Sequence, residues 1–158
     1  MTIRVLVADD QAMIRGALAG LLNLEHDIEV VAQAADGVQV LEELTRLTRQ
    51  NAPLDAIPTS SACPVSPVDV AIVDIEMPHM DGITTTEAIR ARFPGVRVLI
   101  VTTFGRPGYL QRALDAGATG FMVKNAPVEA LAEGVRTLAA GGRAIDQSLA
   151  VEALSTGS

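Results

Sequence analysis

Short apolar segments alternate five times with longer segments of helical periodicity, and this alternation constrains the fold more than any other feature. The apolar segments are rich in β-branched residues, as is typical of strands that are buried on both faces of a sheet. Parallel strands need crossover helices, which cover both faces. We therefore predict an α/β three-layer sandwich around a parallel five-stranded sheet. The expected strands are 3–8, 28–34, 68–73, 96–103 and 119–123, and the expected helices are 11–24, 36–50, 82–92, 107–116 and 127–141.

Composition narrows the class of protein. The chain has 158 residues, of which 49% are hydrophobic, and this fits one globular domain rather than a disordered chain. Because 12 Lys and Arg face 19 Asp and Glu, the net charge is −7, and the chain lacks a general attraction to nucleic-acid phosphates. A single cysteine, Cys63, excludes a disulfide framework. Without a secretory signal or an apolar run of about 20 residues, we expect a cytoplasmic protein with no membrane partner.

Two segments interrupt the regular alternation. Residues 51–67 contain four prolines and only one charged residue, which predicts a surface loop insertion without a function of its own. Residues 143–158 end in a polar run and are expected to begin a linker, so that the folded domain spans 1–142. We expect residues 25–27 to form a solvated turn, and His79 to be an exposed loop residue without a chemical role.

Acidic residues stand where the first and third strands end. Asp9 and Asp10 follow the first strand, and Asp74 follows the third. In open α/β sheets, ligands bind outside the carboxyl ends of the strands. Carboxylates that gather there repel one another and need a cation, and oxygen ligands favour Mg²⁺. An alternative is that these acids cap the following helices, as Asp10 would do before Gln11.

Two further groups are expected at the same edge of the sheet. The fourth strand ends in Thr102 and Thr103, and Lys124 follows the fifth. Carboxylates that hold Mg²⁺, a lysine that neutralises phosphoryl oxygens and a hydroxyl that donates a hydrogen bond together suit a phosphoryl group. One of the carboxylates is then the nucleophile that attacks phosphorus.

Four segments in order resemble those of one known family. They are VLVADDQ at 5–11, VDIEMPHMDG at 73–82, VLIVTT at 98–103 and AGATGFMVK at 116–124. From residue 3 to about residue 150 the chain resembles the receiver domain of a bacterial two-component response regulator. The resemblance implies a flavodoxin-like, doubly wound (βα)5 fold with strand order 2-1-3-4-5.

The resemblance also implies a role for individual residues. A sensor histidine kinase would donate a phosphoryl group to Asp74, in a reaction that needs Mg²⁺ as its cofactor. The chain would be no enzyme beyond catalysing its own phosphorylation and dephosphorylation. Phe121 would be the switch aromatic that responds to Thr102, although it can also be a plain core residue. The implied site comprises Asp74 as phosphoacceptor, Asp9, Asp10, Asp74 and the backbone carbonyl of Glu76 as metal ligands, Thr102 and Lys124 as catalytic groups, and Thr102 and Phe121 as the switch.

The end of the chain is similar to one class within this family. The segment KNAPVEALAEGVRTLAAGGRAIDQSLA resembles the NarL/FixJ class, whose members usually continue into a helix-turn-helix DNA-binding domain. TTFGRPGYLQRAL is similar to the branch that regulates membrane-lipid genes. The chain departs from the family in having Lys124-Asn125 for Lys-Pro, a long connection before the third strand, and no DNA-binding domain. We expect a truncated transcriptional regulator that contacts DNA only through the domain absent here.

Three other functions fit the sequence less well. An aspartyl phosphatase also needs Mg²⁺ and lysine, but that class resembles Asp-x-Asp-Gly-Thr, whereas residues 74–78 read DIEMP. No Gly-x-Gly-x-x-Gly or Walker loop follows any expected strand, which argues against nucleotide binding. A degenerate receiver that only binds other proteins would not need the complete set of acids, threonine and lysine.

The first and last helices predict a homodimer. Residues 16–24, GALAGLLNL, have no charge. A helix that covers one face of a sheet is expected to have a polar stripe on its solvent-exposed side. The last helix has small residues on its flanks, and NarL/FixJ receivers use a similar surface. The alternative is that these alanines reflect helix propensity in a monomer. The expected dimer surface comprises Met13, Ala17, Leu21, Ala130 and Gly134.

Overall fold

The structure is a computed structural model that describes six stretches of the chain. These are residues 2–51, 68–77, 79–93, 95–102, 109–123 and 128–145, without the side chains of 49–51, 109 and 110. Asn51, the first residue of the loop expected at 51–67, instead ends a helix. The rest of that loop, most of the expected linker, Thr103 and Lys124 lie outside the described residues. The expectations for these parts of the chain therefore stay predictions.

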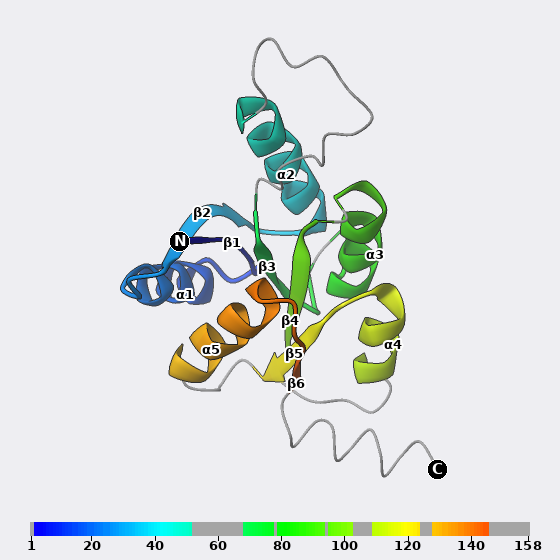
Figure 1. Cartoon of the computed structure of the whole chain (residues 1–158). Helices are drawn as coiled ribbons and strands as arrows, with labels where there is room; N and C mark the ends of the chain where they lie inside the picture. The colour runs from blue at the N-terminus through cyan, green and yellow to red at the C-terminus, as the bar shows by residue number, and fades with distance from the viewer. Residues whose placement is uncertain are drawn as a thin grey trace, which may run out of the picture.

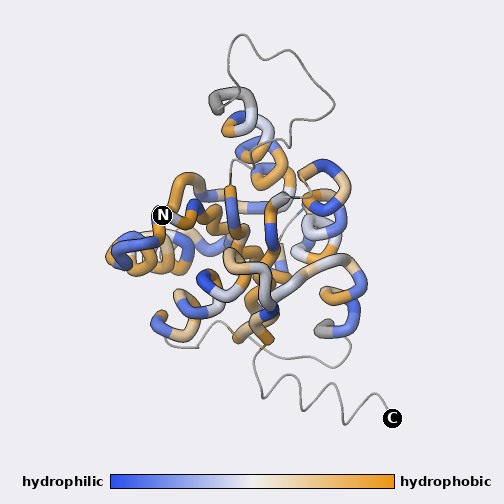
Figure 2. The backbone as a smooth tube through the Cα atoms, viewed as in Figure 1, coloured by the Kyte–Doolittle hydropathy of each residue, from blue (hydrophilic) through white to orange (hydrophobic). Residues whose placement is uncertain are grey.

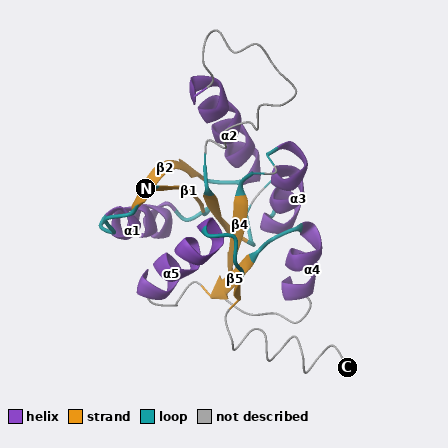
Figure 3. Ribbon diagram, in the orientation of Figure 1, coloured by secondary structure: helices purple, strands orange, loops and turns teal. Residues whose placement is uncertain are grey.

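Helices and strands alternate along the described residues as the sequence predicts (Figure 3). The bounds of the first two strands and of the third helix agree with the prediction to the residue, and the other elements differ by a few residues at their ends. The strands are β1 Ile3–Ala8, β2 Ile28–Ala34, β3 Val70–Asp74, β4 Arg97–Thr102, β5 Gly120–Val123 and β6 Ala144–Ile145, and the helices are α1 Ala12–Asn23, α2 Gly37–Asn51, α3 Gly82–Arg92, α4 Tyr109–Ala116 and α5 Val128–Ala139.

The strands form one parallel sheet in the order β2-β1-β3-β4-β5-β6. This confirms the flavodoxin-like order 2-1-3-4-5 and adds a short sixth strand that the sequence does not predict. In β6, Ala144 pairs with Gly120 and Ile145 with Phe121 of β5. A segment of two residues is too short to show a hydrophobic period, so the sequence predicts that residues 144–145 belong to the linker. The chain at 144–145 instead extends the sheet.

The sheet separates two layers of helices, as Figure 1 shows. Helices α1 and α5 cover one face, and α2, α3 and α4 cover the other. Successive strand residues point to opposite faces, so Val5 and Val7 of β1 pack on the α1 and α5 side, while Leu6 and Ala8 pack on the α2 to α4 side. In Figure 2 the strands are largely hydrophobic, and hydrophilic residues colour the outer helices. Within the described residues, no helix is long and apolar enough to cross a membrane.

Arg136 joins α5 to the loop between α1 and β2. Its guanidinium donates to both carboxylate oxygens of Asp27, at 2.8 and 2.9 Å, and also to Glu25 at 3.3 Å and Glu133 at 2.9 Å. Two-point contacts between a guanidinium and a carboxylate are stronger than ordinary surface ion pairs. The turn at 25–27 stays partly exposed to water, as expected, but its Glu25 and Asp27 also tie it to α5, which the sequence does not predict.

We expect Asp27→Asn to lower the free energy of unfolding near neutral pH, and to lower it less in acid. Hydrogen bonds from Arg136 lower the pKa of Asp27 from its ordinary value of 3.8 to about 2, so folding favours the ionised carboxylate. This contribution is complete above pH 3.8 and is lost as the pH falls through about 2. Urea denaturation at about pH 7 and about pH 3 measures it, with the exposed Asp115→Asn as control. An equal effect of Asp27→Asn at both pH values would contradict the assignment.

Candidate functional site

Three carboxylates meet at the carboxyl ends of two neighbouring strands. Asp9 and Asp10 follow β1, and Asp74 is the last residue of β3. Because β1 and β3 pair with Ala8 opposite Val73, these residues reach the same edge of the sheet. One oxygen from each carboxylate lies within 4.8 Å of the others. Asp9 and Asp74 are buried, whereas Asp10 is exposed, so the cluster extends from the protein interior to water.

Backbone contacts fix the turn that follows β1. The Asp9 N–H donates to the Ala34 carbonyl of β2 at 3.0 Å, and Asp9 Oδ1 accepts from the Gln11 N–H at 2.9 Å. The side chain of Arg15, from the first turns of α1, donates to the Asp9 carbonyl at 2.9 Å. Gln11 is the N-cap residue of α1, so the alternative that Asp10 caps this helix is wrong. Asp10 is left at the mouth of the site.

The loop between β3 and α3 closes the site from the other side. The Glu76 N–H donates to Asp74 Oδ1 at 3.3 Å, and the Gly82 N–H returns to the Ile75 carbonyl at 2.9 Å. Asp81 caps α3 by accepting from the Thr84 N–H at 2.7 Å. A Cβ atom at position 82 would lie 2.4 Å from the Asp74 carbonyl oxygen. Only glycine therefore lets α3 begin this close to Asp74.

A cavity of about 550 Å³ opens beside the acidic cluster. Its lining is polar where Asp10, Glu76 and Asp81 face it. A donor set made of carboxylate and carbonyl oxygens fits a hard divalent cation such as Mg²⁺, and within the described residues this is the only group of three or more possible metal ligands. The residues that line the cavity are Asp10, Ile75, Glu76, Met77, Asp81, Ile83 and Arg112.

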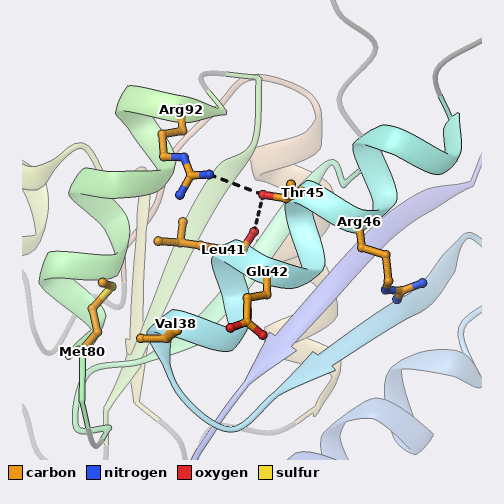
Figure 4. Close-up of a pocket in the computed structure, with 7 residues that line it drawn as sticks. All are labelled: Val38, Leu41, Glu42, Thr45, Arg46, Met80 and Arg92. Carbon is orange, nitrogen blue, oxygen red and sulfur yellow. Dashed lines mark hydrogen bonds between the residues drawn. The ribbon is translucent and has the colours of Figure 1, made fainter.

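A second groove lies between α2 and α3, away from the acidic cluster. Figure 4 shows Val38 and Leu41 of α2 facing Met80 and Arg92 across it. Its volume is about 510 Å³, and its lining is largely apolar, with Glu42 as the one carboxylate. The oxygen ligands that a cation needs are therefore gathered in the first cavity and not in this groove.

The predicted switch residues lie in neighbouring strands. Thr102 ends β4 and is buried, and Phe121 of β5 is buried beside Ile100 on the face covered by α2 to α4. Phe121 is therefore part of the core. It pairs with Ile100, which is two residues before Thr102 in β4. Lys124, predicted at the same edge, lies outside the described residues.

The residues of the predicted dimer surface differ in exposure. Met13 is 88% exposed and Leu21 44% exposed, and Ala17 lies on the same side of α1, one helical turn from each. Ala130 of α5 is half-buried. Gly134 is buried, since a Cβ atom there would lie 3.0 Å from Met122 Sδ of β5. The exposed part of the predicted surface is therefore on α1.

Sequence reasoning missed two residues that shape the site. Arg15 holds the Asp9 carbonyl, and Asp81 caps the helix that begins beside Asp74. The signal for Asp81 was available, because aspartate followed by glycine at the start of a helical period is an N-cap pattern. Arg15 had no signal, since an arginine in a helix does not reveal which carbonyl it reaches.

We expect Asp10→Asn to raise the free energy of unfolding in metal-free buffer. Like charges less than 5 Å apart repel by about 1 kcal/mol in water and by more near a protein surface. Because Asp10 is exposed, replacing its carboxylate by an amide does not bury an unpaired polar group. Urea denaturation with EDTA at low salt should show a gain of about 1 kcal/mol. Glu87→Gln, exposed on α3, is the matched control. A gain no larger than that of the control would show that these carboxylates do not repel.

Comparisons with known proteins agree with this architecture. A family model described as the response regulator receiver domain matches residues 5–136. The transcriptional regulatory protein DesR of Bacillus subtilis is 37% identical over 141 residues, which cover 89% of this chain and 60% of DesR. YvfU, a transcriptional regulatory protein of the same organism, is 35% identical over 147 residues, which cover 93% of this chain and 64% of YvfU. The chain thus spans about three fifths of the length of these relatives.

Among solved structures, the signal receiver domain of NarL from Mycobacterium tuberculosis superposes with a TM-score of 0.73. The two chains are 28% identical, and the match covers 89% of this chain and 98% of that one. The fold of this chain is thus shared with that of a solved receiver domain. Since the family model covers well over half of the sequence, the protein belongs to the response regulator receiver domains.

Proposed function

We propose that this chain is the phosphoacceptor domain of a transcriptional response regulator of the NarL/FixJ class, with Asp74 as the phosphorylated residue. The observation that supports it most is the clustering of Asp9, Asp10 and Asp74 within 4.8 Å beside an open cavity, in a chain of the receiver family. A phosphoryl donor of this family is a sensor histidine kinase, which we propose as the partner.

In the proposed reaction a carboxylate oxygen of Asp74 attacks phosphorus. A P–O bond to Asp74 forms as the P–N bond of the kinase phosphohistidine breaks, and the histidine leaves with the bonding electron pair. Asp9, Asp10, Asp74 and the Glu76 carbonyl would hold Mg²⁺, which supplies positive charge to the phosphoryl oxygens. The Glu76 N–H, 3.3 Å from Asp74 Oδ1, orients the carboxylate.

Thr102 and Lys124 complete the proposed site. Thr102 would donate its hydroxyl hydrogen to a phosphoryl oxygen, and Lys124 would neutralise another. Movement of Thr102 toward the phosphoryl group opens space beside Phe121, so phosphorylation would shift a two-state equilibrium in this part of the core. The chain would turn over only its own acyl phosphate, and act on no other substrate.

The output of the switch is proposed to be transcriptional. DesR and YvfU are named transcriptional regulatory proteins, and this chain covers about three fifths of each. We propose that the regulator binds DNA through a C-terminal domain outside this chain, because the chain itself has a net charge of −7 and does not attract phosphate backbones.

We expect acetyl phosphate with Mg²⁺ to add one phosphoryl group to the chain, and Asp74→Asn to abolish this addition. Intact-protein mass spectrometry measures the label, and EDTA should prevent it if the acidic cluster holds the metal. The control is Asp115→Asn, an exposed carboxylate on α4, which should be labelled like the wild type. Undiminished labelling of Asp74→Asn would rule out this phosphoacceptor.

A homodimer through α1 and α5 is the proposed structural response. Met13, Ala17 and Leu21 make an exposed apolar stripe on α1, and α1 contacts α5 on the same face of the sheet. An exposed apolar stripe of this kind marks an interaction surface. A twofold dimer would bring the stripes of two copies together and place two DNA-binding domains side by side.

We expect beryllofluoride with Mg²⁺ to convert the chain to a dimer, and Leu21→Asp to keep it monomeric, because the substitution puts a charge into the apolar stripe. Sedimentation at high micromolar concentration measures the oligomeric state. Val38→Asp is the matched control, since Val38 is a similarly exposed apolar residue on α2. A dimer that survives Leu21→Asp but not Val38→Asp would place the interface on the other face.

A further inference from the structure

The loop after Asp74 contains a residue in an unfavourable backbone conformation. His79 has a φ of 68°, and it is the only described residue other than glycine with a positive φ. This conformation is unfavourable for a residue with a side chain, and it persists where the surroundings enforce it. Its side chain is 72% exposed, so burial of the ring does not enforce it.

A hydrogen bond to a distant carboxylate holds the His79 ring. Its Nδ1 lies 2.9 Å from Oδ2 of Asp36, 43 positions earlier in the chain. Asp36 is only 7% exposed, and its Oδ1 accepts from the Gln39 N–H at 2.9 Å in the first turn of α2. The hydrogen bonds from Gln39 and then from His79 lower the pKa of Asp36. The carboxylate is thus an ionised anchor at the start of α2.

The next residue of the loop packs against the same helix end. A Cβ atom on Gly37 would lie 2.8 Å from the Cβ of Met80, so the backbone of α2 and the loop are in direct contact. Figure 4 shows Met80 facing Val38 across the groove between the helices. Two successive loop residues, His79 and Met80, therefore dock on the first turn of α2.

This docking lies three residues from a proposed metal ligand. Glu76 and Met77 line the cavity beside the acidic cluster, and the Glu76 N–H contacts Asp74. The other end of the loop is fixed by the bond from the Gly82 N–H to the Ile75 carbonyl. Glu76 and Met77 thus lie in the chain between two held residues, Ile75 and His79.

We propose that Asp36 and His79 form a positioning pair, which holds the loop after Asp74 in the geometry that Mg²⁺ requires. The proposal rests on the proposed function, since it takes Mg²⁺ to be the ligand of the acidic cluster. Neither residue touches the metal or the phosphoryl group; both act through the backbone of Glu76. Residues that orient metal ligands from outside the ligand set commonly change metal affinity by about tenfold or more when they are replaced.

The test compares His79→Gly with His79→Asn. Glycine removes the hydrogen bond and also the cost of the positive φ, whereas asparagine tolerates this conformation and its amide can donate to Asp36. We expect His79→Gly to weaken Mg²⁺ binding by about tenfold while its unfolding midpoint in EDTA stays unchanged or rises. His79→Asn should bind Mg²⁺ within about twofold of the wild type, because it restores the bond. Calorimetric Mg²⁺ titration and urea denaturation measure the two quantities.

Further measurements separate the pair from a general effect on folding. In metal-free protein, the amide resonances of Glu76 and Met77 should shift in His79→Gly and stay near their wild-type positions in His79→Asn. Asp36→Asn, which keeps a side-chain oxygen for the Gln39 N–H, should weaken Mg²⁺ binding, and His79→Gly should add little to it. Wild-type affinity in His79→Gly would overturn the positioning pair alone. Absence of Mg²⁺ binding by the wild type would overturn the proposed function as well.

Discussion

Burial of a parallel sheet on both faces is the constraint on which the other features of this structure depend. Every residue of β3, from Val70 to Asp74, is buried, and such strands tolerate polar groups only where they end. Parallel strands all end at the same edge, so the carboxylates that follow β1 and β3 are brought together by the same burial that forms the core. The sheet topology thus brings the acidic residues together, although Asp74 is far from Asp9 and Asp10 in the sequence.

Gathering these charges has a structural consequence. The three carboxylates repel one another. The loops that carry them must therefore be held in place by other contacts. The turn after β1 is held by Ala34 and Arg15 through backbone atoms of Asp9. The loop after β3 is held by Gly82, by the cap of α3 and by the Asp36–His79 pair. Both loops are therefore anchored on neighbouring elements.

The alternation of strands and helices and the positions of the acids were predictable from local patterns in the sequence, whereas the strand order followed from the resemblance to receiver domains. Hydrophobic periodicity predicts each strand and helix of the five repeats, and strand ends predict where the acids lie. Contacts between distant residues have no such signal. Arg136 and Asp27 are 109 positions apart, and His79 and Asp36 are 43 apart. The exposure of His79 is as predicted, but neither of these two contacts has a signal in the sequence. The sequence does not predict the strand β6 for a different reason: two residues are too few to show a hydrophobic period.

Helix α1 has apolar residues on both its inner and its outer side. Ala19 and Leu22 of α1 are buried beneath the helix, while Met13 and Leu21 are exposed on its outer side. The helix has no side-chain cap at its start and no acidic residue in its first turn, so local interactions contribute little to its stability. Packing must supply most of it, and the sheet packs against only one side. A helix that is apolar on both sides gains further stability when a second surface covers the other side. Because Arg136 ties α5 to the turn that follows α1, the two helices lie side by side on one face that a second surface can cover.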